Sequence, residues 1–577
     1  MGASAIERAI PGIGMLRSYR PRWLGKDLTA GLVLSALLVP QGMAYAELAG
    51  LPAITGLYTT ILCLLGYAVF GPSKVLVLGP DSSLGPMIAA TIIPLVAADG
   101  DPVAAVAYAS ILALLVGLIT VLAGVFRLGF VADLLSRPTQ IGYINGLALT
   151  IVIGQLPKLF GFSVDGDGLI DEAAGFAKGV ADGLTIPAAL LVGIGSLLVI
   201  LLLGRFLPRI PGVLVAVVAA IAAAAAFQLG DHGVDLVGAL PQGFPPFTIP
   251  SVPLDDLALL VAGALGIALV SLTDTISTAS AFAARRGDDV DGDREMIGIG
   301  AANIAAGLFQ GFPVSTSGSR TAVAEQNGAK SQVTGIIGAL AVTLMLVFVP
   351  GLLKNLPQPT LAAIVIAASM SLADIPGLRR LWRQRRSDFA LAMIAFLGVA
   401  ILGVLPGIGI AVLLSVLDVF RRAWRPHRAA LGRVAGLGGY HDTLDYPGAQ
   451  QLPGLVMYRF DAPLIFANAR TFRDDIRRIA DREPAPTWII VAAEPITDID
   501  TTAADMLAEL DQRINDRGVS LVFAEVKSAV RRKIDRYELT STINPEHFYP
   551  TVDEAVEAYR QHVAAQTAAD DDPEPPR

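Results

Sequence analysis

Long apolar stretches separated by short polar turns recur along this chain from Leu28 to Val419, and most are long enough to cross a bilayer. We count fourteen, near residues 28–46, 54–70, 82–98, 102–123, 139–156, 184–204, 210–228, 257–282, 294–311, 317–326, 333–350, 358–372, 387–404 and 407–420. The composition agrees: 53% of the 577 residues are hydrophobic and 16% are charged, against about a quarter charged in soluble domains. The pattern predicts a polytopic α-helical membrane protein.

Charged residues in the connections predict the orientation of these segments. Basic residues follow the even-numbered segments: Lys74, Arg127, Arg137, Arg205, Arg209, Arg285, Arg286, Lys330, the arginines from Arg379 to Arg386, and those from Arg421 to Arg428. The opposite loops run acidic, with Lys158, Lys178 and Lys354 as exceptions; their acidic residues are Asp99, Asp101, Asp165, Asp167, Asp171, Glu172, Asp182, Asp231, Asp235, Asp255 and Asp256. Because cytoplasmic loops carry the excess of Lys and Arg, we expect a multi-pass protein of the inner (cell) membrane with both termini in the cytoplasm.

This alternation holds only if the short tenth segment counts as half a crossing, completed by the polar passage that contains it. That passage, Phe312–Val323 (FPVSTSGSRTAV), is rich in Pro, Gly and Ser and carries one arginine. Gly79–Pro86 (GPDSSLGP) opens the third segment in the same extended-then-helical manner. Ser82 and Ser317 are 235 positions apart, and Gln41 and Asp274 are 233 apart. The spacing predicts two halves of seven segments with inverted topology, and half-helices in their third and tenth segments mark the binding site of a transporter.

A small α/β domain follows the membrane region. We expect a cytoplasmic N-terminal segment at 1–26, a transmembrane domain at 27–424, a Gly-rich linker leading into the next domain at 425–453, an α/β domain at 454–565 and a disordered acidic tail at 566–577. Within the α/β domain we expect two strands in LVMYRFDAPLIFAN, strands in TWIIVAAEP and VSLVFAEV, and three helices.

Four motifs together resemble the sulfate permease (SulP) family of anion transporters: PQGMAYAELAGLPAITGLY (Pro40–Tyr58), VDGDREM (Val290–Met296), FPVSTSGSRTAV and PITDIDTTAADML. The C-terminal domain is similar to the STAS (sulfate transporter and anti-sigma factor antagonist) domain. The resemblance covers nearly the whole chain. It implies a mobile core of segments 1–4 and 8–11, a gate of segments 5–7 and 12–14, and a homodimer that works by elevator-type alternating access.

Arg320 is the one formal cation of the Phe312–Val323 passage, and a charge at membrane depth is costly enough to indicate a function. We expect it to attract an anion toward the half-helix ends, while neutral donors complete the site: Ser317, Gly318 and Ser319 in the second half, and Ser82 and Ser83 in the first. The serines also suit ordinary helix capping, and Arg320 also suits a helix-paired structural role. Family likeness adds Gln41 and Tyr45, which otherwise fit helix–helix hydrogen bonding and core packing.

Asp274 lies in the middle of the eighth segment and is the candidate for coupling to a cation gradient. It would take up a proton, or coordinate sodium together with Thr273 and Thr278; a structural pair with Arg320 is the alternative. Where this chain has aspartate, the family usually has glutamate, so proton and sodium both stay open. We expect no other cofactor and no metal site, because the one cysteine, Cys63, is in an apolar segment and the five histidines are scattered.

In the C-terminal domain, Asp500, Thr501 and Thr502 lie between a strand and a helix, where they suit helix capping or a regulatory surface for a cytoplasmic partner. No nucleophile–base pair, phosphate loop or dinucleotide fingerprint stands out, so we expect neither an enzyme nor a nucleic-acid partner. The predicted function is secondary active transport of an inorganic oxyanion, with sulfate first. The alternatives are bicarbonate, C4-dicarboxylates such as fumarate, and an uncoupled anion channel; a membrane scaffold and a nucleobase carrier are disfavoured.

Overall fold

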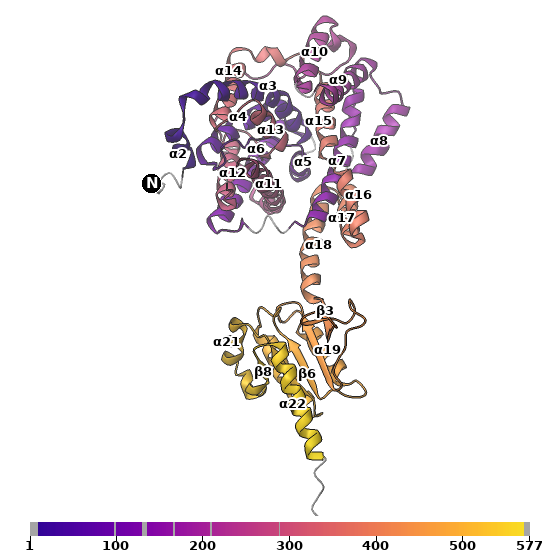
Figure 1. Ribbon diagram of the computed structural model, residues 1–577. Helices are drawn as coiled ribbons and strands as arrows, with labels where there is room; N and C mark the ends of the chain where they lie inside the picture. Colours follow the sequence, from indigo (N-terminus) through magenta and orange to yellow (C-terminus); the bar gives the residue numbers. More distant parts are fainter. Residues whose placement is uncertain are drawn as a thin grey trace, which may run out of the picture. The chain divides into compact units, whose positions relative to one another are not determined.

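The computed structural model describes residues 10–96, 100–129, 135–164, 168–207, 210–287 and 289–570 (Figure 1). The chain forms two compact units that divide between Ser415 and Val416. Residues 1–9 of the expected N-terminal segment and residues 571–577 of the expected tail lie outside the described residues.

A helix corresponds to each of the fourteen apolar segments. In chain order these are α3 (Leu24–Leu48), α4 (Ala53–Phe70), α5 (Gly85–Ile92), α6 (Pro102–Val125), α7 (Arg137–Phe160), α9 (Pro187–Phe206), α10 (Gly212–Ala226), α11 (Leu257–Arg286), α12 (Gly292–Gly307), α13 (Gly318–Gln326), α14 (Val333–Phe348), α15 (Gln358–Leu372), α17 (Arg386–Leu402) and α18 (Val404–Trp424). The two broken segments are short, because α5 has 8 residues and α13 has 9. The predicted half-helices are therefore present at both positions.

Among the described residues, α2 (Pro11–Ser18) lies in the expected N-terminal segment, where an interfacial helix is one expectation. Two more helices, α8 (Leu169–Ala181) and α16 (Ile375–Gln384), occur where the sequence predicts connecting loops. α8 is docked by aromatic contacts, since Phe176 lies edge-on to Phe160 at 5.0 Å and stacks on Phe162 at 6.0 Å. All three are short and amphipathic, so they lack the long apolar run by which the other helices were recognised.

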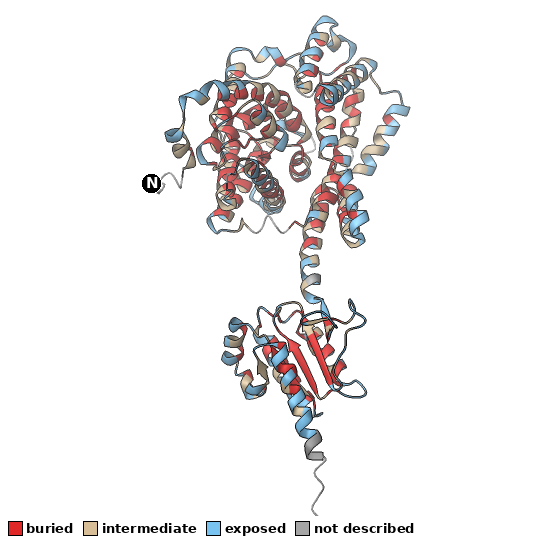
Figure 2. Ribbon diagram, in the orientation of Figure 1, coloured by how far each residue is buried: buried red, intermediate tan, exposed pale blue. Residues whose placement is uncertain are grey.

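The helices of the first unit have the surface expected in lipid. Among the described residues, eight helices are long and apolar enough to cross a membrane, and Gly85–Leu95, Gly212–Ala226 and Val333–Phe348 are shorter apolar helices. On α9 the side chains of Leu191, Leu198 and Leu202 are 75%, 50% and 51% exposed. Figure 2 shows such exposed positions on helices whose inner faces are buried. Apolar surface of this extent is typical of contact with lipid, which confirms a helical membrane protein; that all fourteen segments cross remains a prediction.

Helix contacts in the first unit form matching pairs. Replacing each helix of a contact by its counterpart in the other half gives the second contact of the pair. α6 packs on α12 as α14 packs on α4, and α11 packs on α6 as α3 packs on α14. α11 also packs on α5 as α3 packs on α13. The pattern agrees with two matching halves, and their inverted orientation stays a prediction. A second group forms around α7 and α15, which pack on each other and on α17 and α9 respectively, and α3 joins the two groups through α15 and α10.

Two extended segments cross at the centre of the first unit. β1 (Leu78–Gly79) pairs antiparallel with β2 (Ser315–Thr316), and each strand leads into a half-helix. Their flanking backbone groups are satisfied from both halves: Val77 N donates to Thr321 Oγ1 at 3.1 Å, and Ser317 N donates to Val77 O at 3.2 Å. Since lipid offers no hydrogen bonds, non-helical backbone at this depth requires such partners.

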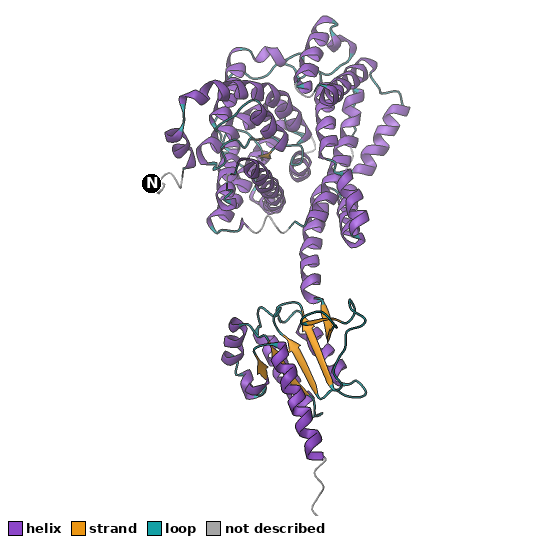
Figure 3. Ribbon diagram, viewed as in Figure 1, coloured by secondary structure: helices purple, strands orange, loops and turns teal. Residues whose placement is uncertain are grey.

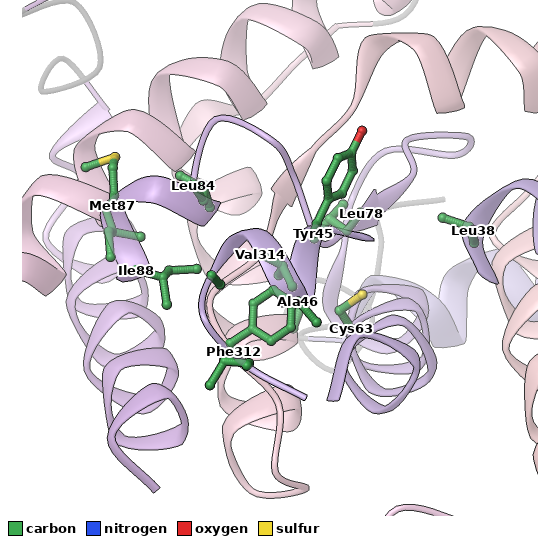
Figure 4. Packing of buried hydrophobic residues seen from close by; sticks show 14 of the residues in the cluster. Leu38, Tyr45, Ala46, Cys63, Leu78, Leu84, Met87, Ile88, Phe312 and Val314 are labelled. Carbon is green, nitrogen blue, oxygen red and sulfur yellow. The ribbon is translucent and has the colours of Figure 1, made fainter. Parts of the chain in front are cut away.

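Side chains of neighbouring helices brace the second of these segments. Asn303 on α12 accepts from Val314 N at 2.9 Å, and Thr59 on α4 accepts from Phe312 N at 3.1 Å. Phe312 and Val314 are buried in the apolar core with Ala46 and Cys63 (Figure 4). Buried polar side chains therefore hold this segment in place by hydrogen bonds within the apolar core.

The second unit contains a six-stranded sheet with strand order β4-β3-β5-β6-β7-β8. Figure 3 shows its strands in orange beside helices in purple. Its strands are β3 (Arg428–Arg433), β4 (Tyr440–Asp442), β5 (Leu455–Phe460), β6 (Trp488–Ala492), β7 (Ser520–Ala524) and β8 (Phe548–Tyr549), with β5 to β8 parallel. Helices α19 (Ala469–Ala480), α20 (Thr501–Asn515) and α21 (Ser528–Arg536) cover one face, and α22 (Val552–Asp570) covers the other. Successive residues of β5 alternate between the two cores, as a strand requires. The α/β prediction is confirmed.

Three details of this unit differ from the sequence analysis. The stretch expected as a Gly-rich linker contains the antiparallel pair β3–β4, in which Leu431 is buried. The glycines of the neighbouring turns hide these short strands in the composition. Only one strand forms in LVMYRFDAPLIFAN; its second half makes a single bridge, Leu464 to Ile499. α22 continues to Asp570, into the stretch expected as a disordered tail.

Candidate functional site

Arg320 lies in the first turn of α13 and is 1% exposed. Ser317 is the N-cap of this helix and accepts from Arg320 N at 3.5 Å, so the capping role expected of the serine is present. Gly318 and Ser319 are exposed, and a Cβ added at Gly318 would meet nothing within 4 Å. The amino end of α13 therefore faces open space while the guanidinium beside it is enclosed.

The guanidinium of Arg320 has one described acidic partner. Its Nη2 donates to Asp81 Oδ2 at 3.3 Å, and the Asp81 side chain is 14% exposed. Its Nε and Nη1 have no hydrogen-bond partner among the described residues. Buried donors are ordinarily satisfied, so the N–H donors of two nitrogens of this arginine are available to a ligand.

Asp81 brings the first half-helix to the same place. Its Oδ1 accepts from Ser83 N at 3.0 Å and from Ser83 Oγ at 2.8 Å, which shapes the turn before α5. The amino ends of α5 and α13 thus meet around the Asp81–Arg320 pair. Both amino ends carry a positive dipole, which favours anions. The amides at the start of α5 are already bonded, since Leu84 N and Gly85 N donate to Asp81 O.

Asp274 is near this pair but is not the partner of Arg320. Ser83 Oγ lies 3.4 Å from Asp274 Oδ2, so one serine hydroxyl lies between two carboxylates. The alternative prediction of a direct Asp274–Arg320 pair is wrong, because the described acidic partner of Arg320 is Asp81, from the other half. Asp274 is partly exposed, consistent with a group that exchanges with water.

The remaining predicted residues lie on the surrounding helices. Tyr45, on α3, is buried, forms a side-chain hydrogen bond with Ser82 and lies within electrostatic range of Arg320 and Asp81. Gln41 is one turn earlier on α3 and is partly exposed. The Ser317 and Ser319 hydroxyls are 3.0 Å apart.

The two threonines proposed for sodium differ in position. Thr273 Oγ1 donates to Leu269 O at 2.8 Å on its own helix. Thr278 is four residues after Asp274, so the two share one face of α11. Among the described residues no three His, Cys, Asp or Glu side chains lie close enough to hold a metal ion.

Three residues of the site were not singled out from the sequence. Asp81 is the partner of Arg320, and a Cβ on Gly79 would lie 2.6 Å from Arg320 Nη1, so any other residue there would require the guanidinium to move. Tyr143, on α7, is buried within electrostatic range of Asp274 and Asp81. The one available signal was for Asp81, an acidic residue in the broken segment that matches the segment of Arg320.

Two other buried carboxylates, Asp27 and Glu295, serve packing. Asp27 accepts at 2.6 Å from Lys330 N and at 2.9 Å from Ser331 Oγ, which ties the start of α3 to the start of α14. Glu295 accepts from Tyr67 Oη at 2.6 Å and from Ser73 Oγ. A cavity of about 830 Å³ lies elsewhere, between the α3–α4 connection and the amino end of α15, where Gln358 Nε2 donates to Glu47 at 2.8 Å.

The candidate loop of the C-terminal unit has a clear structural role. Asp500 is the N-cap of α20, and its carboxylate accepts from Ala503 N at 2.8 Å and from Phe466 N at 2.7 Å. Thr501 and Thr502 are exposed in the first turn. The Lys533 ammonium hydrogen-bonded to Asp498 holds the pKa of that carboxyl below its usual value. The expected capping is present, and the exposed threonines leave a regulatory role open.

Comparison with known proteins matches this architecture from end to end. Residues 24–395 match the sulfate permease family, and residues 446–555 match the STAS domain. A probable sulfate transporter of Mycobacterium tuberculosis is 42% identical over 552 residues, covering 96% of this chain and 98% of that one.

Sulfate transporter 4.1, chloroplastic, of Arabidopsis thaliana is 31% identical over 98% of this chain and 84% of its own length. The solved structure of the murine Solute Carrier 26 family member A9 anion transporter in the inward-facing state has the same fold, with a TM-score of 0.88 at 24% identity over 97% of this chain and 96% of that one. The resemblance drawn from the motifs is confirmed: the chain belongs to the sulfate permease family and carries a C-terminal STAS domain.

Proposed function

We propose that this protein is a secondary active transporter of inorganic oxyanions and that sulfate is its main substrate. The observation that carries the proposal is Arg320, whose buried guanidinium keeps two nitrogens, Nε and Nη1, without a described partner at the open amino end of α13. The names of the relatives, which are sulfate transporters, support the choice of anion.

The site would bind a tetrahedral oxyanion mostly through neutral donors. Ser82, Ser83, Ser317, Ser319 and the free amides around Gly318 offer hydrogen bonds from the two helix ends, and Arg320 supplies positive potential beside them. Gln41 and Tyr45 would close the site from α3. Since Asp81 pairs with Arg320 when no anion is bound, the arginine does not hold the anion permanently, which suits a substrate that must leave again.

Transport would follow elevator-type alternating access in a homodimer of the inner membrane, with both termini in the cytoplasm. The group around α3 to α6 and α11 to α14 would move against the group around α7 and α15. Asp274 would couple this movement to a proton gradient, or with Thr273 and Thr278 to sodium. The STAS domain would serve a cytoplasmic partner through Thr501 and Thr502.

Substrate size and coupling separate the alternatives. Bicarbonate is smaller and singly charged, whereas fumarate needs a longer pocket with a second cationic or donor group. An uncoupled channel would conduct without saturating at low substrate and would ignore cation gradients.

The test is uptake of labelled sulfate, bicarbonate and fumarate into proteoliposomes of the full chain, with proton and sodium gradients imposed separately. Saturable sulfate uptake that one gradient drives above equilibrium is expected. Arg320→Gln should abolish it, whereas Asp255→Asn, a change at an exposed loop carboxylate of the same unit, should not. A folded chain that moves none of the three anions would refute the proposal.

A further inference from the structure

A single hydroxyl lies between the two carboxylates of the site. Ser83 Oγ is 2.8 Å from Asp81 Oδ1 and 3.4 Å from Asp274 Oδ2. A serine hydroxyl has one hydrogen to donate and two lone pairs that accept. The shorter contact, together with the donation from Ser83 N to the same oxygen at 3.0 Å, assigns that hydrogen to Asp81. Asp274 can then bond to Ser83 only as a donor, that is, in its protonated form.

Asp81 is also the built-in anion of Arg320. Its other oxygen, Oδ2, is the one that accepts from Arg320 Nη2 at 3.3 Å. An oxyanion that approaches the guanidinium therefore competes with a carboxylate of the protein itself. With Arg320 charged and both carboxylates ionised, the three side chains sum to one negative charge, which repels a sulfate. One added proton brings the sum to zero and a second makes it positive.

We propose that Asp81 is an internal counter-ion that yields Arg320 to the substrate by taking up a proton, and that Ser83 carries this proton from Asp274. The inference rests on the proposed function and names a residue and a step within it. The O–H bond of protonated Asp274 breaks as Ser83 Oγ accepts its proton, and the hydroxyl proton of Ser83 passes to Oδ1 of Asp81. The serine is unchanged and Arg320 is left with a neutral neighbour. The Asp274 carboxylate, now ionised, takes up one proton from solution, so one proton enters the site for each anion bound.

The groups that face Asp81 favour this exchange. Arg320 comes from α13, Asp274 from α11, Tyr45 from α3 and Tyr143 from α7. The two tyrosines are neutral near pH 7, so among the described residues the balance is set by one cation and one other carboxylate. Substrate binding removes the benefit of an ionised Asp81, because the anion takes its place beside Arg320 and repels it. Proton uptake and anion binding are thus linked.

The test measures sulfate binding to the purified full chain between pH 5.5 and 8, together with proton uptake in a weakly buffered solution containing an indicator dye. The unaltered chain should take up about one proton per sulfate. Its Kd for sulfate should rise as the pH rises, by up to about tenfold per pH unit, the limit for one linked proton. Asp81→Asn keeps the shape of the side chain and its acceptor for Ser83. It should bind sulfate at pH 8 about as tightly as the unaltered chain does at low pH, with a nearly flat Kd. Asp255→Asn is the matched control and should keep the full slope.

Two results would overturn the inference while leaving the proposed function standing. One is an Asp81→Asn variant whose Kd keeps the unaltered dependence on pH. The other is sulfate binding by the unaltered chain with no proton uptake, a measurement that needs no variant and so does not depend on whether Asp81→Asn folds. Absence of any oxyanion binding by the unaltered, folded chain would instead refute the proposed function and this inference with it.

Discussion

The Asp81–Arg320 pair predicts a strong energetic coupling between two residues 239 positions apart in the sequence. The joined atoms are 3.3 Å apart and the side chains are 14% and 1% exposed. Opposite charges about 4 Å apart interact by about 4 kcal/mol at an effective dielectric constant of about 20. Removing one member of a buried pair leaves an uncompensated charge and costs about 3–5 kcal/mol. Arg320→Gln should therefore lower the free energy of unfolding by about that amount.

The double variant separates the pair from the individual residues. In Arg320→Gln with Asp81→Asn no charge is left unpaired, so the two losses should fall short of additivity by about 2–4 kcal/mol. The four proteins can be compared by equilibrium unfolding of the full chain in mixed micelles with increasing dodecyl sulfate. A second cycle that combines Arg320→Gln with Asp255→Asn should be additive within about 0.5 kcal/mol. Coupling below about 0.5 kcal/mol for Asp81 and Arg320 would refute the pairing.

Three further predictions follow from single contacts. Asp27→Ala leaves backbone N–H groups unpaired at the start of α14 and should cost about 2–5 kcal/mol of unfolding free energy in the same assay; Asp27→Asn, which keeps an acceptor, should cost less, and equal losses would contradict this role. Gly79→Ala should raise the KM for sulfate about tenfold or more at unchanged folded yield, because its Cβ would displace the guanidinium; an unchanged KM would show that the guanidinium position is unimportant. Burial raises the pKa of Asp511 in α20 to about 6. A raised carboxyl pKa means that stability present below about pH 4 is lost as the pH rises through about 6. Asp511→Asn should therefore stabilise the C-terminal unit by about 1–3 kcal/mol at pH 7. The variant's free energy of unfolding should also change less with pH between about 4 and 6. Hydrogen exchange of β6 and β7 in the full chain measures this, and an unchanged slope would contradict it.

The features that the sequence predicts best are those that depend on a local pattern of residues. Long apolar runs locate the helices. Pro, Gly and Ser within such runs locate both half-helices, because a helix that is broken at membrane depth needs such residues at the break. Arg320 was recognised for the same reason: a lone cation between apolar segments is conspicuous. Local capping chemistry likewise predicted the positions of Ser317 and Asp500.

The features that were missed depend on the fold in three dimensions. Asp81 is one of several polar residues in Gly79–Pro86, and it is the pairing of β1 with β2 that brings it against Arg320. Tyr143 comes from a helix whose own sequence gives no reason to face Asp274. The short helix α8 and the hairpin β3–β4 are stabilised by the neighbours that they pack on rather than by a strong pattern of their own.

The central claim, that the oxyanion binds at Arg320, can be tested most directly with selenate, a heavy isostere of sulfate. Crystals of the full chain with selenate should give an anomalous selenium peak about 4 Å from the Arg320 guanidinium, between the amino ends of α5 and α13, at the distance set by charge-assisted hydrogen bonds. The peak should vanish in Arg320→Gln. A selenium peak elsewhere, for example in the 830 Å³ cavity beside Glu47 and Gln358, with none at Arg320 would contradict the account.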